Sequence, residues 1–72
     1  MAGVHGVKIT LNGREKTLAS AVTVQDLLLD MGMADRRVAV ELNREIVPRS
    51  RHAEVRLRDN DSVEVVAAIG GG

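Results

Sequence analysis

A single amphipathic helix is indicated in this chain, and segments with the alternation of strands lie on both sides of it. Apolar residues recur at the spacing i, i+3, i+4 and i+7, at Val24, Leu27, Leu28 and Met31. Thr23 can cap the first turn, with Asp26 three residues on, a shortened capping box. Gly32 stands where a left-handed C-cap is wanted, so a helix is predicted over residues 24–31. One apolar helix face has one sheet to cover, and a two-layer fold follows.

Strands and turns are predicted from alternating apolar and polar residues and from the turn residues between them. Asn12-Gly13 is the strongest hairpin signal, because a type I′ turn needs positive φ at both central residues. Further turns are expected at Asn43-Arg44 and at Asp59-Asn60-Asp61, and Pro48 ends a short strand. The predicted strands are 7–11, 16–18, 38–42, 45–47 and 62–68, with a helical turn over 50–53 and an extended piece over 55–57.

This order of elements predicts an α+β fold, with a mixed sheet of four to five strands packed on one main helix. The strands of the first hairpin are too close in sequence for a crossover, whereas the last strand can lie parallel beside the first. Val63 and Val65 are expected on the helix side of that strand, and Glu64 and Val66 on its other side. The chain of 72 residues allows one small domain, over residues 1–69, followed by a flexible glycine tail at 70–72.

Composition excludes several classes of function. The chain has no cysteine, and therefore no disulfide, thiolate metal site or cysteine nucleophile. His5 and His52 lack ligand-like spacing, and His52 is expected to be a surface or corner residue. Ten basic residues balance ten acidic ones, and no aromatic side chain is present to stack on a base, so nucleic-acid binding is not expected. Arginines do gather in one stretch, which predicts a solvated face or the flank of a docking surface.

The same sequence carries no sign of membrane insertion or export. No apolar run approaches the roughly 20 residues that cross a bilayer. The segment 1–5 also lacks the basic and apolar regions of a signal peptide. A cytoplasmic protein without a membrane partner is the expectation.

Three glycines, Gly70, Gly71 and Gly72, directly follow the apolar run 63–69. Glycine has no Cβ, so its backbone can pass close to other groups. At about 3.3–3.6 Å per extended residue, three glycines carry a carboxylate roughly 10 Å from the fold. Such a tail is shaped to enter a narrow active site of another protein. Gly70 and Gly71 are therefore expected to thread that site, and Gly72 to carry the reacting group.

Several segments together resemble one family. They are 23–28 at the helix start, 39–43 leading to 46–49, the turn 59–61 leading into 63–65, and the glycine end. In this order they resemble the ThiS-type sulfur carriers of thiamine biosynthesis, which implies a ubiquitin-like β-grasp fold. The chain departs from the family in having His52 where members often have Trp, and Asn60 where Gly is common. Gly70 is an extra small residue, since two glycines suffice in the family.

The resemblance implies a chemistry for the terminal carboxylate. An α-carboxyl group has a pKa of about 3.3–3.7, so it is an anion and a poor electrophile at neutral pH. An E1-like, ThiF-type enzyme using ATP and Mg²⁺ is implied to adenylate Gly72. A sulfur donor then displaces AMP, and the resulting thiocarboxylate passes to a ThiG-type thiazole synthase. The chain itself is expected to bind no cofactor or metal and to act as a carrier, since it has no Ser/His/Asp set and no P-loop.

Partner docking is expected from the surface near the tail, with the candidates Val66, Ala68, Ile69 and Arg49. Three alternatives stay open. The chain could be a β-grasp sulfur carrier of another pathway, for molybdopterin, tRNA thiolation or cysteine synthesis, although the segments 47–49 and 67–69 favour the thiamine type. It could be a modifier attached to a target lysine. It could also be a non-covalent ubiquitin-like binding module whose tail has no chemistry.

Overall fold

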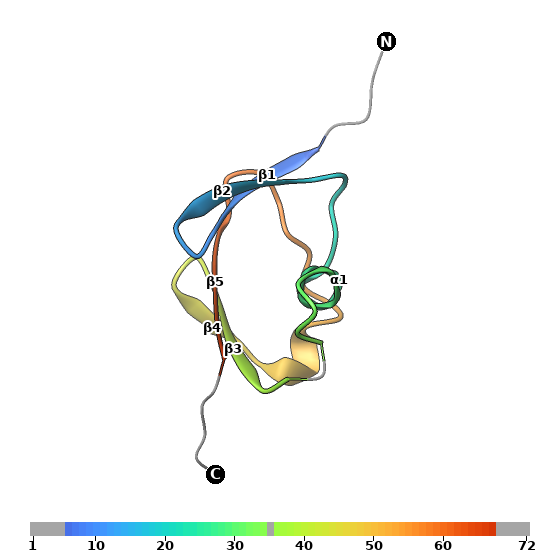
Figure 1. Ribbon diagram of the computed structural model, residues 1–72, viewed down its shortest axis with the longest axis vertical. Helices are drawn as coiled ribbons and strands as arrows, with labels where there is room; N and C mark the ends of the chain where they lie inside the picture. The colour runs from blue at the N-terminus through green and yellow to red at the C-terminus, as the bar shows by residue number, and fades with distance from the viewer. Residues whose placement is uncertain (1–5, 35, 68–72) are drawn as a thin grey trace.

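The fold is one mixed sheet with one α-helix packed across it (Figure 1). The computed structural model describes residues 6–34 and 36–67. In chain order the elements are β1 (Val7–Leu11), β2 (Arg14–Leu18), α1 (Val24–Asp30), β3 (Val38–Leu42), β4 (Glu45–Val47), the 3₁₀ helix η1 (Arg49–Arg51) and β5 (Ser62–Ala67).

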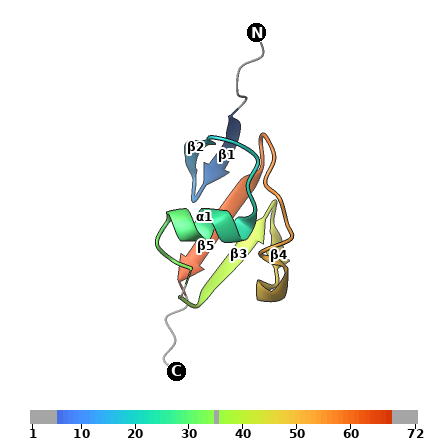
Figure 2. The same ribbon diagram turned by 90° about the vertical axis from the view of Figure 1, so that its right-hand side faces the viewer.

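The sheet has the order β2-β1-β5-β3-β4, so the last strand of the chain lies in the middle. β5 is parallel to β1 and antiparallel to β3, and the two hairpins form the outer parts of the sheet. Figure 2 looks onto the face that α1 crosses. We call the opposite side the open face. The predicted mixed sheet of four to five strands on one helix, with its terminal strand parallel to the first, is confirmed, and the sheet has five strands.

Both hairpins turn through two residues with positive φ. Asn12 and Gly13 have φ of 50° and 82°, as the type I′ prediction requires. Asn43 and Arg44 repeat this geometry, with φ of 51° and 72°. Glycine or asparagine is usual at such positions, so Arg44 is strained there.

α1 is capped at both ends by hydrogen bonds. Asp26 N–H donates to Thr23 Oγ1 at 3.1 Å, and Thr23 N–H donates to Asp26 Oδ2 at 3.0 Å, which completes the predicted capping box. At the other end Gly32 has φ of 73°, and Met33 N–H donates to the Leu28 carbonyl at 2.8 Å. This is a Schellman motif. It ends the helix at Asp30, one residue earlier than predicted.

The space between sheet and helix is filled by aliphatic side chains from every strand and from α1. The buried set is Val7, Ile9, Leu18, Val24, Leu27, Leu28, Val40, Val47, Leu57, Val63 and Val65. Met31 and Met33 pack against this core and are partly buried, in agreement with their predicted gap-filling role.

Two local predictions are wrong in part, namely the start of the helical turn and the surface placement of His52. The helical turn forms at Arg49–Arg51, starting one residue earlier than expected. The short extended piece predicted over 55–57 does form, and Arg56 pairs with Thr23 there in an isolated antiparallel bridge. His52 is not a surface residue: only 6% of it is exposed, and its Nε2 lies 3.1 Å from the Val47 carbonyl oxygen. That hydrogen bond removes much of the cost of burying the ring.

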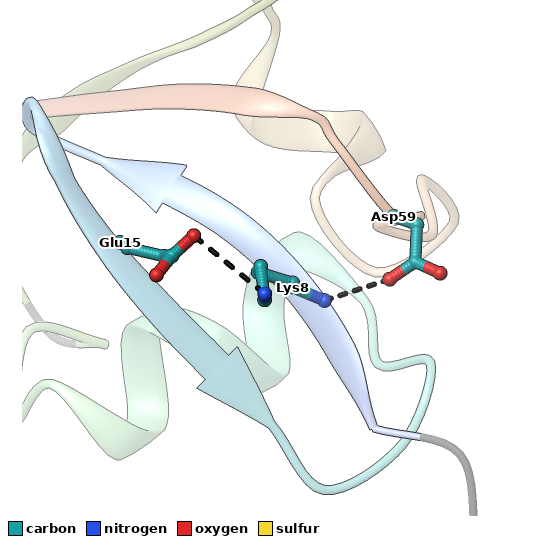
Figure 3. A network of polar contacts seen from close by, with 3 residues as sticks. All are labelled: Lys8, Glu15 and Asp59. Carbon is teal, nitrogen blue, oxygen red and sulfur yellow. Dashed lines mark hydrogen bonds and ion pairs between the residues drawn. The ribbon is translucent and has the colours of Figure 1, made fainter.

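The turn before β5 is fastened to β1 by polar contacts (Figure 3). Lys8 N–H donates to Asp59 Oδ1 at 2.8 Å, and the Lys8 carbonyl accepts from Asn60 N–H at 2.7 Å. The Lys8 ammonium lies 3.8 Å from a carboxylate oxygen of Glu15 on β2. The backbone of Lys8 therefore fixes where the chain enters β5.

Candidate functional site

The candidate site is the end of β5 and the surface around it, since the glycine tail follows this strand. Only two residues of β1, Thr10 and Leu11, pair in register with β5. Asn12 extends this short contact: its N–H donates to the Val63 carbonyl at 2.9 Å, and its Oδ1 accepts from Val65 N–H at 2.8 Å. The hydrogen bonds of Asn12 thus extend the pairing of β1 with β5 beyond Leu11.

A second asparagine holds the opposite edge of the same strand. Asn43 Oδ1 accepts from Ser62 N–H at 2.9 Å, and Asn43 Nδ2 donates to Asp61 Oδ1 at 3.0 Å. β3 continues the contact from Leu42 to Val38, where Val38 is opposite Ala67. β5 is therefore hydrogen-bonded on both sides, and the tail starts from a firmly held strand.

Val66, one of the predicted docking residues, lies on the open face and is 60% exposed. It is directly opposite Ala39 on β3, and both side chains point away from the core. Ile46 on β4 belongs to the same face and is 64% exposed. We call Ala39, Ile46 and Val66 the open-face patch. Two of its members are large exposed apolar side chains, which mark interaction surfaces when they gather on one face.

Carboxylates border this patch. Glu41 is directly opposite Glu64 on β5 on one side and Ile46 on β4 on the other. Like charges directly opposite one another destabilise a sheet, so this pair is not explained by folding. Arg44 lines a hollow of about 330 Å³ together with Glu41, Ser62 and Glu64, which places one cationic residue near the two carboxylates.

Arg49, the other predicted docking residue within the described part, lies in a hollow that borders the open-face patch at Ala39. It stands in η1, is exposed, and lines a hollow of about 270 Å³ beside α1. His52 and Leu28 line the same hollow. Ala39, which is directly opposite Val66, lines this hollow as well, so the hollow borders the open-face patch although Val66 itself does not line it. Sequence reasoning gave no role to the arginines at 36 and 37 in this hollow, because nothing local marks them.

The remaining predicted site residues, Ala68, Ile69, Gly70, Gly71 and Gly72, lie outside the described residues. Within residues 6–34 and 36–67, no group of three or more histidine and carboxylate side chains could hold a metal ion. Over that same part of the chain, no helix has the length and apolarity needed to cross a membrane.

Comparison with known proteins agrees with this geometry. The sequence model of the ThiS family matches residues 9–72, which includes the glycine tail. The chain belongs to the ThiS family. It is 40% identical over 65 residues to the sulfur carrier protein ThiS of Bacillus subtilis, covering 89% of this chain and 98% of that protein.

A solved ThiS structure has the same fold. The crystal structure of the thiamine biosynthesis protein ThiS from Geobacter metallireducens matches with a TM-score of 0.79 and 33% identity, covering 92% of this chain and all of that one. The ubiquitin-like β-grasp prediction is thereby confirmed, as is the resemblance to ThiS.

Two other relatives are much longer than this ThiS family member. A protein named thiazole synthase from Paramagnetospirillum magneticum is 47% identical over 66 residues, and one from Magnetococcus marinus is 41% identical over 66 residues. The chain spans 20% of the length of each. In both proteins a ThiS-like segment is thus part of a polypeptide named for thiazole formation.

Proposed function

We propose that this chain is a sulfur carrier for thiamine biosynthesis, whose Gly72 carboxylate is converted to a thiocarboxylate. The observation that carries the proposal is the family match through residue 72, in a fold whose firmly held central strand leads into the glycines. A β-grasp module without tail chemistry would have no need for three consecutive glycines after such a strand.

The proposed reaction proceeds in two steps. The Gly72 carboxylate attacks the α-phosphate of ATP in a partner enzyme, and pyrophosphate leaves. Hydrosulfide supplied by the sulfur donor then attacks the acyl carbon, AMP leaves with the C–O bonding pair, and loss of the S–H proton leaves the thiocarboxylate. In this scheme the partner supplies ATP, Mg²⁺ and the catalytic groups, and this chain supplies the substrate carboxylate and no catalytic side chain.

The partners proposed are a ThiF-type adenylating enzyme, a sulfur donor and a ThiG-type thiazole synthase. The last is supported by the two relatives named thiazole synthase that contain a ThiS-like segment. Joining two modules in one polypeptide raises their effective concentration to about the millimolar range, an advantage only where the modules act on one another. The same observation favours thiazole formation over the other sulfur-transfer pathways.

The open-face patch is the proposed docking surface for the enzyme that takes the tail. Val66 is only one residue before the end of β5, so a partner that encloses the tail also reaches Val66 and Ala39. Exposed aliphatic side chains at this place add binding energy without contacting the reacting carboxylate.

The deciding experiment is the intact mass of the protein after incubation with a ThiF-type enzyme, ATP, Mg²⁺ and sulfide. We expect one oxygen to be replaced by sulfur, and fragmentation to place the change at Gly72. The reaction requires a free α-carboxylate on Gly72. The intact mass of the untreated protein, purified from its source organism, shows whether this group is present.

Two outcomes would contradict the proposal. One is an unchanged mass while the same enzyme converts the ThiS of Bacillus subtilis. The other is continued ATP–pyrophosphate exchange by a variant that lacks residues 71 and 72. Either result would favour a non-covalent binding module.

A further inference from the structure

A groove with three arginines lies beside α1 and borders the open-face patch at Ala39. It consists of two adjoining hollows of about 270 and 330 Å³, which share the lining residues Leu28, Ala34, Arg49 and His52. Arg36 and Arg37 line the first hollow, and Gln25 and Leu29 the second. We call this the basic groove.

Among the described residues, those that line the basic groove carry charge of one sign. No aspartate or glutamate of the described part of the chain lines either hollow. Lys8, Lys16 and Arg51 each have a carboxylate within ion-pair distance. Among the described residues, no carboxylate lies within that distance of the three groove arginines. The other arginines of the described residues line neither hollow, whereas these three line one concavity.

The floor of the groove is apolar. Leu28 and Ala34 line both hollows, and Val38 lines the first. Leu29 at one end is 56% exposed, an unusual position for a leucine on a helix that otherwise buries its apolar residues. A ligand that fits this lining carries carboxylates for the guanidinium groups and an aliphatic side chain for the floor. A free inorganic anion would leave the apolar floor unused.

The groove also adjoins the place where the tail begins. Val38 and Ala39 line it, and they are opposite Ala67 and Val66 on β5. We propose that the basic groove binds an acidic segment of a protein partner, one with carboxylates next to an aliphatic residue. Assigning this segment to an enzyme that takes the tail rests on the proposed function; the binding of such a segment does not.

The first test is an amide NMR titration of the protein with a synthetic peptide in which glutamate and leucine alternate. We expect shifts at Leu28, Ala34, Val38 and Arg49, weaker binding in higher salt, and about 10-fold weaker binding to Arg49→Glu and to Arg37→Glu. Arg14→Glu is the matched control, because it makes the same charge change at an exposed arginine on β2 and should alter the affinity less than about twofold.

Several results would overturn the proposal. They are no binding, equal binding of a peptide with glutamine in place of glutamate, or shifts confined to Ile46 and Val66 or to Arg56 and Arg58. If inorganic phosphate alone gives the same shifts and displaces the peptide, the groove is a small-anion site instead.

The second test is ATP–pyrophosphate exchange with a ThiF-type enzyme. Arg49→Glu and Arg37→Glu should raise KM for the carrier about 10-fold with kcat unchanged. This is the result expected when the lost contacts stabilise the bound carrier and the transition state equally. An unchanged KM, with the wild type active, would remove the assignment to this enzyme. Absence of exchange by the wild type would count against the proposed function, and the peptide titration would still decide the groove.

Discussion

Asn12 Oδ1 accepts a hydrogen bond from Val65 N–H at 2.8 Å, which joins the first turn of the chain to its last strand across 53 residues. Val65 lies two residues from the end of β5. Asn12 therefore has two roles. It adopts the positive φ that the hairpin turn requires, and its side chain holds the strand that precedes the tail.

Asn12→Gly separates these two roles, because glycine keeps the positive φ but has no side-chain acceptor. We expect a loss of about 1–2 kcal/mol in the free energy of unfolding, from the hydrogen bond and from added freedom in the unfolded chain. Asn12→Asp keeps an acceptor and should lose less. Urea unfolding of both variants measures this. Equal losses would mean that Asn12 Oδ1 contributes nothing to β5.

Arg44→Gly should stabilise the protein. Arg44 has φ of 72°, and this conformation costs an L-residue about 1–2 kcal/mol. Glycine removes that strain, but its greater conformational entropy in the unfolded state offsets part of the gain. We expect a net gain of up to about 1 kcal/mol by urea unfolding. Asn43→Gly is the control: it should destabilise, since Asn43 also bonds Ser62 and Asp61. A loss of stability in Arg44→Gly would show that the Arg44 side chain outweighs the strain.

The capping box predicts a defined pH dependence. The hydrogen bond from the Thr23 backbone, and then that from its hydroxyl, hold the pKa of Asp26 below its ordinary value. A pKa that is lower in the folded state stabilises the fold above the ordinary value, about 3.9, and this contribution disappears as the pH falls through the folded pKa.

Asp26→Asn, which cannot ionise, should therefore have a lower Tm than the wild type at pH 7. The difference should shrink as the pH is lowered below about 4. Thermal unfolding by circular dichroism at a series of pH values measures it. A difference in Tm that stays constant down to the lowest pH would mean that the Asp26 charge has no part in the cap.

His52→Leu should destabilise the corner between β4 and α1. Leucine is apolar and fills part of the space of the ring, but it leaves the Val47 carbonyl without the donor now 3.1 Å away. The expected cost is about 1–3 kcal/mol in the free energy of unfolding. A variant as stable as the wild type would show that the His52 ring contributes packing alone.

Val66→Glu should impair docking without unfolding the chain, because Val66 is 60% exposed. We expect KM for the carrier in ATP–pyrophosphate exchange to rise about 10-fold or more, from lost apolar contact and from a third carboxylate beside Glu41 and Glu64. Thr17→Glu, on the same face over β2, is the control and should leave KM unchanged. An effect of equal size in both variants would point to general charge repulsion.

The sequence by itself determined the local elements of this protein, because each depends on residues within a few positions. The capping box at Thr23, the Gly32 C-cap, the Asn12-Gly13 turn and the alternation in β5 all follow from short-range geometry. The glycine end and the motif order were likewise sufficient to indicate the ThiS family.

Tertiary structure alone decided what joins distant parts of the chain. Asn12 and Asn43 hold β5 from opposite edges, His52 is buried against Val47, and Arg37 shares a groove with Arg49. None of these has a local signal, since a side chain's neighbours across a sheet depend on strand order and register. Placing β5 between β1 and β3 fixed that order, and with it the two surfaces beside the root of the tail.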